Sequence, residues 1–179
     1  MGRAGGQNRY VATKRSRKFH GYHEVGSEMG VTEYEFTIRP YVTEDREAIV
    51  ALWRRVFTGD PPWNEPNDMI ARKESVQPDL FLVGVLGEQV AGTVLAGFDG
   101  VRGWVHHLAV LPEFRRKGFA NLLMDRAEEG LVELGCPKLN LQVRGSNAEV
   151  IAFYESRGHA VEDVISLGKP LGRWRRDPV

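Results

Sequence analysis

Hydrophobic positions along the chain repeat with two different periods, which predict strands and helices. Short runs rich in β-branched and aromatic residues predict the strands, which span residues 36–39, 81–86, 90–98, 104–110, 139–143, 160–162 and 164–168. Apolar positions three and four residues apart predict the helices, which span about residues 43–56, 68–76, 118–134 and 147–157. This order of elements predicts an α/β (α+β) domain with a mixed, mostly antiparallel sheet of six to seven strands and helices on both faces.

Two element ends carry residues that such ends favour. Thr43 is expected to cap the first helix, because Glu44 and Asp45 then lie in its first turn, where the helix dipole favours acids. Pro112 is expected to end the strand at 104–110, because proline has no N–H for a sheet ladder.

Composition indicates one globular domain that does not enter a membrane. The chain has 179 residues, is 42% hydrophobic and 27% charged, and carries zero formal net charge. No apolar run approaches the roughly 20 residues of a membrane span. Cys136 is the only cysteine, which excludes an internal disulfide and a multi-cysteine metal site. We therefore expect a cytoplasmic protein without a metal.

The two ends of the chain differ from the rest in composition. Residues 1–30 show neither period, and the first 28 residues hold six Lys/Arg against two acids, so we expect a basic, disordered extension. The domain is expected at 31–172, followed by an Arg-rich tail at 173–179. A basic extension could contact nucleic acid, but no nucleic-acid-binding fold accompanies it, so nucleic acid is not a favoured partner.

The helix that follows strand 104–110 begins with unusual chemistry. Arg115, Arg116 and Lys117 precede the small residue Gly118, and the helical pattern starts at once. A helix N-terminus presents free backbone N–H groups and the positive end of the dipole, and small residues let an anion come close. The stretch therefore predicts a phosphate site, the alternative being a basic helix start that is merely solvated.

A family resemblance makes this interpretation more specific. The stretch LAVLPEFRRKGFA resembles the acyl-CoA-binding signature of the GNAT superfamily of N-acetyltransferases, L-A-V-x-P followed by R-x-x-G-x-A, here Arg115, Gly118 and Ala120. The resemblance covers about residues 36–171, and the segments LNLQV and FYE resemble a bacterial subgroup that indicates no particular acceptor. It implies the GNAT fold with splayed fourth and fifth strands, acetyl-CoA as the donor, and direct attack by a primary amine in a ternary complex.

The resemblance also implies how the donor binds. The diphosphate would be held by the segment Arg115, Arg116, Lys117, Gly118, Phe119 and Ala120. The pantetheine arm would pair with the backbone of Leu108 to Val110, including Ala109, and an N–H near Val110 would polarise the thioester carbonyl.

Two residues of the helix at 147–157 are further candidates. Asn147 would hydrogen-bond the cofactor, and Tyr154 would bind beside it and protonate the departing thiolate as a general acid. The alternative for Tyr154 is a packing role in the core.

The catalytic base is sought in a pair of histidines. His106 and His107 are neighbours on one strand, so their side chains are expected on opposite faces of the sheet. By resemblance, a base on this strand lies on the face of Trp104 and His106, which makes His106 the predicted base and places His107 under the helices. A packed, non-catalytic role remains open for both.

The acceptor is less determined than the donor. The GNAT fold would place its pocket between the first two helices and the last strands, near Trp63, Asn64 and either Asp99 or the Arg-rich tail, with Trp104 as a further candidate for acceptor binding. Trp63 would either stack on an acceptor or stiffen its proline-rich loop. The acceptor is a small amine or a peptide, with an N-terminus or lysine as its nucleophile. A non-catalytic acyl-CoA sensor is the rival function, and the edge strand at 164–168 makes a homodimer an open expectation.

Overall fold

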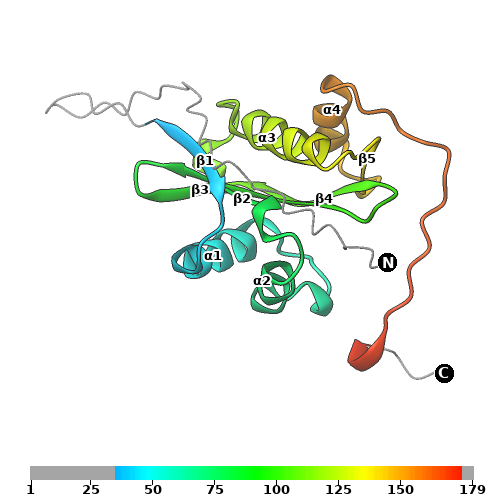
Figure 1. The fold of residues 1–179 in the computed structure, drawn as a ribbon, viewed down its shortest axis with the longest axis horizontal. Helices are drawn as coiled ribbons and strands as arrows, with labels where there is room; N and C mark the ends of the chain where they lie inside the picture. Colours follow the sequence, from blue (N-terminus) through cyan, green and yellow to red (C-terminus); the bar gives the residue numbers. More distant parts are fainter. Residues whose placement is uncertain (1–34, 175–179) are drawn as a thin grey trace, which may run out of the picture.

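A computed structural model describes residues 35–174, and they form three layers (Figure 1). The middle layer is one sheet of strand order β1-β2-β3-β4-β5. Its strands are β1 (Phe36–Pro40), β2 (Phe81–Leu86), β3 (Gln89–Phe98), β4 (Gly103–Val110) and β5 (Leu139–Leu141). Helices α1 (Arg46–Val56) and α2 (Pro66–Glu74) cover one face, and α3 (Phe119–Glu133) and α4 (Ala148–Ser156) cover the other.

The sheet is mixed, as expected from the sequence. Strands β1 to β4 pair antiparallel, whereas β5 pairs parallel to β4. The predicted last pair of strands at 160–162 and 164–168 is not formed, so the described part of the sheet has five strands instead of six to seven. The predicted α/β class, with helices on both faces, is confirmed.

Apolar side chains form a separate cluster on each face of the sheet. Under α1 and α2, Ile49, Leu52 and Trp53 pack on residues of β2 and β3, and under α3 and α4 the buried residues include Leu123 and Met124. This division explains the hydrophobic pattern of the sequence. Each helix has one apolar stripe, whereas the inner strands β2 and β3 are apolar on both faces and form short continuous apolar runs.

The first helix begins differently from the prediction. Thr43 does not cap it; a 3₁₀ turn (Thr43–Asp45) precedes α1, and the carboxylate of Asp45 accepts a hydrogen bond from the Val42 N–H at 3.0 Å. The Arg39 guanidinium donates to both oxygens of Asp45 at 2.6 and 2.8 Å. The expected threonine cap is thus absent, and the start of α1 is instead attached to β1 through the Arg39–Asp45 ion pair.

Strands β4 and β5 separate after a short contact. Their ladder joins only Gly103, Trp104 and Val105 to Leu139–Leu141, and β4 then continues through residues 106–110 with no strand beside it on that edge among residues 35–174. This is the splay that the resemblance implied. It leaves backbone N–H and C=O groups of β4 available at the middle of the fold.

The chain after α4 runs around the edge of the sheet. Residues 160–171, here named the C-terminal arm, have no helix or strand and lead from the α4 side past β5 to a 3₁₀ turn (Gly172–Trp174) near α2 (Figure 1). Among residues 35–174, no helix is both long enough and apolar enough to cross a membrane. The predicted extension at 1–30 and the tail beyond residue 174 lie outside the described residues.

Candidate functional site

The N-terminus of α3 is open in the way an anion requires. Gly118 stands at the N-cap with φ of +83°, no side chain caps the helix, and its first turn holds no acid. A Cβ at Gly118 would meet no atom within 4 Å, so space lies in front of the helix. Glycine suits this position because it adopts positive φ without strain and exposes the N–H groups that follow.

The basic loop before α3 is fastened to the end of β4. Arg115 Nε donates to the Val110 carbonyl at 3.3 Å, while Lys117 Nζ lies 5.3 Å from the centre of the Phe114 ring. Arg115 and Arg116 are exposed. Arg115, Arg116 and the uncapped α3 N-terminus therefore lie next to the unpaired stretch of β4. This arrangement fits the phosphate group that the sequence predicted here.

A bulge in β4 positions the two histidines. The β3–β4 register shifts between Thr93 and Leu95, and His107 has φ of +50°, a left-handed conformation that histidine rarely adopts. Trp53 Nε1 donates to Thr93 Oγ1 at 2.8 Å, and the Thr93 hydroxyl reaches the His107 carbonyl at 3.3 Å. Because Thr93 is fully buried, this chain of hydrogen bonds holds the bulge from within the core.

The expectation that the two histidines face opposite ways is wrong. The His107 ring packs against Trp53 and Phe57, with ring centres 4.9 and 4.6 Å apart, so it lies under α1. His106 pairs across the ladder with Leu95, which belongs to the same cluster under α1 and α2. The bulge adds a residue to β4, which breaks the alternation and turns both rings toward one face.

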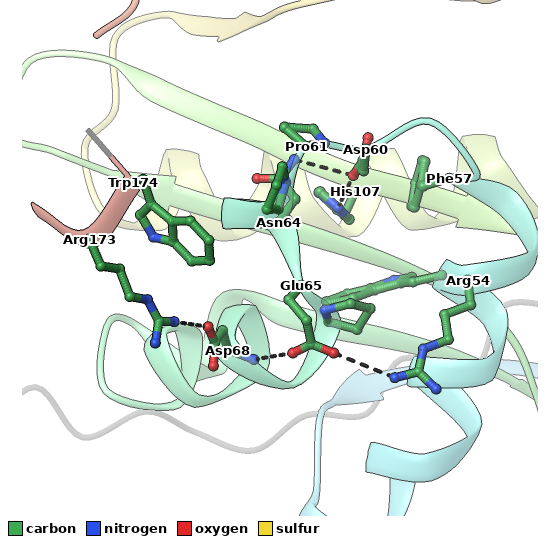
Figure 2. A pocket seen from close by; sticks show the side chains of 13 residues that line it. Arg54, Phe57, Asp60, Pro61, Asn64, Glu65, Asp68, His107, Arg173 and Trp174 are labelled. Atoms are coloured by element: carbon green, nitrogen blue, oxygen red, sulfur yellow. Dashed lines mark hydrogen bonds and ion pairs between the residues drawn. The ribbon is translucent and has the colours of Figure 1, made fainter. Parts of the chain in front are cut away.

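A cavity of about 600 Å³ opens beside His107 (Figure 2). Its walls come from α1, the loop at 57–65, the start of α2 and the turn at 172–174. Asn64 lines it, as the sequence predicted, and so do Arg173 and Trp174 of the expected tail. Trp63 and Trp104 are not among its lining residues.

The two tryptophans outside the cavity have other contacts. Trp63 is 41% exposed, and its carbonyl accepts a hydrogen bond from Arg72 at 2.7 Å. Trp104 stacks on His106 with ring centres 6.4 Å apart, and its Nε1 donates to Asp99 at 3.2 Å. Both are close in sequence to residues that line the cavity, but neither is part of its wall.

Asp60 is the residue that sequence reasoning missed. Its Oδ2 lies 3.1 Å from His107 Nε2 and accepts a hydrogen bond from Asn64 Nδ2 at 3.2 Å. Arg144, in the segment after β5, lies 3.8 Å from the other oxygen and donates to the Gly59 carbonyl at 2.8 Å. Asp60 stands in the proline-rich loop GDPPWNEP, but nothing in that loop indicates that its partner is His107.

The surroundings of both histidines favour their neutral forms. Burial lowers the pKa of His107 below 6.5, partly offset by the negative charge of Asp60. Desolvation, together with the positive charge of Lys73, lowers the pKa of His106. Lys73 is itself unusual, because burial lowers its pKa to about 8. A neutral imidazole can accept a proton, which a catalytic base must do.

Charged pairs close the far side of the cavity. Arg173 pairs with Asp68, and Arg54 lies 3.5 Å from Glu65, as Figure 2 shows. Glu65 also accepts a hydrogen bond from the Asp68 N–H at 3.0 Å and so caps α2. The turn at 172–174 is therefore held to α2 through a side-chain contact.

The two candidates on α4 take structural positions. Asn147 is the N-cap of α4, where its Oδ1 accepts from the Val150 N–H at 3.4 Å. Tyr154 is 8% exposed and lies in the cluster on the α3 side, with its ring edge-on to Phe153 and His159. Burial raises the pKa of Tyr154 to about 12, so its hydroxyl stays protonated. Within residues 35–174, no three His, Cys, Asp or Glu side chains are grouped to hold a metal ion.

Comparison with known sequences gives one consistent family. Residues 46–159 match the sequence model described as the acetyltransferase (GNAT) family. An acetyltransferase of Pectobacterium atrosepticum is 43% identical over 134 residues, which is 75% of this chain and 94% of that protein. An acetyltransferase of Yersinia enterocolitica is 42% identical over 134 residues, with the same two shares.

Solved structures agree in fold. An aminoglycoside N-acetyltransferase in complex with CoA superposes with a TM-score of 0.63 at 19% identity, covering 77% of this chain and 97% of that one. An N-acetyltransferase of Thermoplasma acidophilum in complex with coenzyme A gives a TM-score of 0.62 at 21% identity, covering 73% and 93%. At these identities the likeness shows the fold alone.

Proposed function

This chain belongs to the acetyltransferase (GNAT) family, and on that premise we propose that it transfers an acetyl group from acetyl-CoA to a primary amine bound in the cavity beside His107. The unpaired stretch of β4 carries the proposal. It has His107 near one end, and its other end leads to Arg115 and the uncapped N-terminus of α3. A donor held along this edge would thus reach the acceptor cavity.

The donor would be bound mainly by backbone groups. The N–H groups of Gly118, Phe119 and Ala120 lie at the uncapped start of α3 and, with Arg115, Arg116 and Lys117, suit a diphosphate. The free edge of Leu108, Ala109 and Val110 suits an amide chain that pairs as a short strand. When bound, acetyl-CoA supplies a reactive thioester, and an N–H near Val110 would stabilise the negative charge that develops on its carbonyl oxygen.

On the acceptor side, His107 is the base that the geometry favours over His106. His107 lines the cavity, and Asp60 contacts its Nε2, which leaves Nδ1 as the proton acceptor of the neutral ring. His107 would take the proton from the incoming ammonium, directly or through water, and Asp60 would stabilise the imidazolium. His106 is the predicted base that stacks on Trp104 outside the cavity wall, and it serves as the matched comparison.

Tyr154 and Asn147 keep the roles that the resemblance implies. A Tyr154 hydroxyl that stays protonated at neutral pH can give its proton to the departing thiolate. The Asn147 side-chain oxygen caps α4, and its amide group remains for the cofactor. In the cavity, Asn64 would contact the acceptor, and Trp63 and Trp104 would do so only for an acceptor that extends beyond it.

An acceptor screen tests the proposed function. The full chain is mixed with acetyl-CoA and a panel of small amines, polyamines, amino acids and peptides with free N-termini or lysines, and the release of free thiol is followed. We expect turnover with at least one acceptor. Binding of acetyl-CoA in calorimetry without turnover for any acceptor would support the sensor instead, and the absence of both would contradict acetyl transfer.

A further inference from the structure

The C-terminal arm exposes an unusual amount of apolar surface. Its large apolar side chains are 70–91% exposed, namely Val161, Val164, Ile165, Leu167 and Leu171. Monomeric proteins rarely leave such a row of apolar residues on one segment in contact with water. The arm also forms no strand ladder, so its backbone is unpaired along most of its length.

One side of the arm is already used by its own subunit. Glu162 pairs with Lys138, and Ser166 accepts a hydrogen bond from Gln142, so these contacts attach the arm beside β5. The arm bends at Asp163, but residues 164–171 have no turn or bend. Where such a segment is extended, residues two apart share a face, which places Ile165, Leu167, Lys169 and Leu171 on the face opposite to Ser166. That outer face contains the two most exposed apolar side chains of the arm, Leu167 and Ile165.

The outer face is complementary to a reversed copy of itself. In an antiparallel arrangement centred on Ser166, Ile165 of one arm meets Leu167 of the other, and Asp163 meets Lys169. Within residues 35–174, neither Asp163 nor Lys169 makes an ion pair. A twofold axis makes every such contact occur twice, which is how identical subunits associate.

We propose that two copies of this chain form a homodimer through their C-terminal arms, which pack face to face and antiparallel about a twofold axis at Ser166. The apolar residues of the outer faces leave water together, and Asp163 of each arm pairs with Lys169 of the other. Another protein partner would have to match both the apolar row and this order of charges, whereas a second copy matches them by symmetry.

The dimer also bears on the cavity. The arm continues directly into the turn at 172–174, whose Arg173 and Trp174 line the cavity wall. In the single subunit this turn is held mainly by the exposed pair of Arg173 and Asp68. Anchoring the arm in a dimer would fix the chain just before this wall, which the single subunit already forms.

The test measures the mass of the full chain by analytical ultracentrifugation over a wide range of concentrations. We expect twice the 20.1 kDa of one chain. Changing both Ile165→Lys and Leu167→Lys should weaken the dimer about a hundredfold or more, because two buried apolar side chains are lost from each arm. Val101→Lys is the matched control, since Val101 is 62% exposed on the turn between β3 and β4 and should leave the dimer intact.

The charge pair gives a second, milder test of the register. Asp163→Lys should weaken the dimer about threefold to tenfold, and the double change Asp163→Lys with Lys169→Asp should restore it. These side chains are exposed, so circular dichroism should show all variants folded. A wild-type chain that stays monomeric, a dimer that survives Ile165→Lys with Leu167→Lys, or a charge swap without rescue would each overturn the proposal.

Discussion

The proposed donor and acceptor sites of this molecule are built from different parts of the chain. The main part of the proposed donor site is a helix N-terminus and a strand edge that are contiguous in the chain, from residue 106 to residue 120. The acceptor cavity collects side chains from α1, the loop at 57–65, α2, β4 and the turn at 172–174. Backbone groups would therefore bind the donor, which the members of a family share, whereas side chains from several elements would bind the acceptor, which can differ between members.

Loss of His107 should have the largest effect, because it should lower catalysis on the acceptor without changing the binding of the donor. His107→Asn should lower kcat/KM about 10²- to 10⁴-fold and leave the affinity for CoA unchanged, because the base acts only on the acceptor. Its lowered pKa predicts that wild-type kcat/KM falls as the pH drops below 6.5, and the variant should lack this decrease. Steady-state kinetics across pH, with His106→Asn as the comparison, measures both effects. A larger loss in His106→Asn would return the role to His106.

Tyr154→Phe should lower kcat about tenfold to a hundredfold, with little effect on CoA affinity, because only the proton for the thiolate is lost.

The pH dependence of the free energy of unfolding gives a second, independent test of Tyr154. The folded-state pKa of about 12 exceeds the ordinary 10, so the unfolded chain releases this proton first and the free energy of unfolding falls as pH rises from 10 toward 12. This dependence amounts to about 2–3 kcal/mol and should vanish in the variant. An unchanged kcat would assign Tyr154 to packing alone.

Changing Arg115 and Arg116 together to Ala should weaken CoA binding about tenfold, since two positive charges near the diphosphate are removed. Isothermal titration calorimetry measures this, and the KM for the amine should stay the same. Arg102→Ala is the control, because Arg102 is exposed on the turn between β3 and β4, at the end of the fold where α3 finishes and not at the N-terminus of α3. Equal affinity in the double variant and the wild type would remove these arginines from the donor site.

Trp174→Ala should have the smallest effect, about a threefold to fivefold rise in the KM of the acceptor, since one aromatic wall of an open cavity is lost. The affinity for CoA should not change. Trp63→Ala is the matched control, because Trp63 is the tryptophan of the same region that does not line the cavity. A stronger effect of Trp63→Ala would mean that the acceptor binds outside the cavity.

Most elements of the fold could be predicted from local sequence. Helix α3 is an example, because its apolar stripe, the glycine before it and the basic loop are neighbours in the chain. The start of α1 could not be predicted in detail, since it depends on Asp45, whose carboxylate is held by Arg39 of β1 and does not cap the helix. The strands expected after α4 have high β-propensity, but β5 offers them only side-chain contacts, so they remain an arm.

The facing of the histidines shows why the acceptor site is harder to predict. Strand alternation was the correct rule for a regular β4, but the bulge depends on hydrogen bonds from Trp53 and Thr93, which lie far away in sequence. The pairing of Asp60 with His107 depends in turn on that bulge. A motif records contacts between neighbours, whereas this site is specified by tertiary contacts.

The placement of the cavity has a consequence for how its specificity can change. Apart from Trp53, its walls lie outside the fully buried residues of the two clusters, in the loop at 57–65, at the exposed start of α2 and in the turn at 172–174. Apart from Phe57, which packs on a core cluster, and Glu65, which caps α2, substitutions there should cost little folding free energy, because they remove no core packing. Evolution or laboratory selection can therefore change the acceptor specificity while the fold and the proposed donor site stay the same.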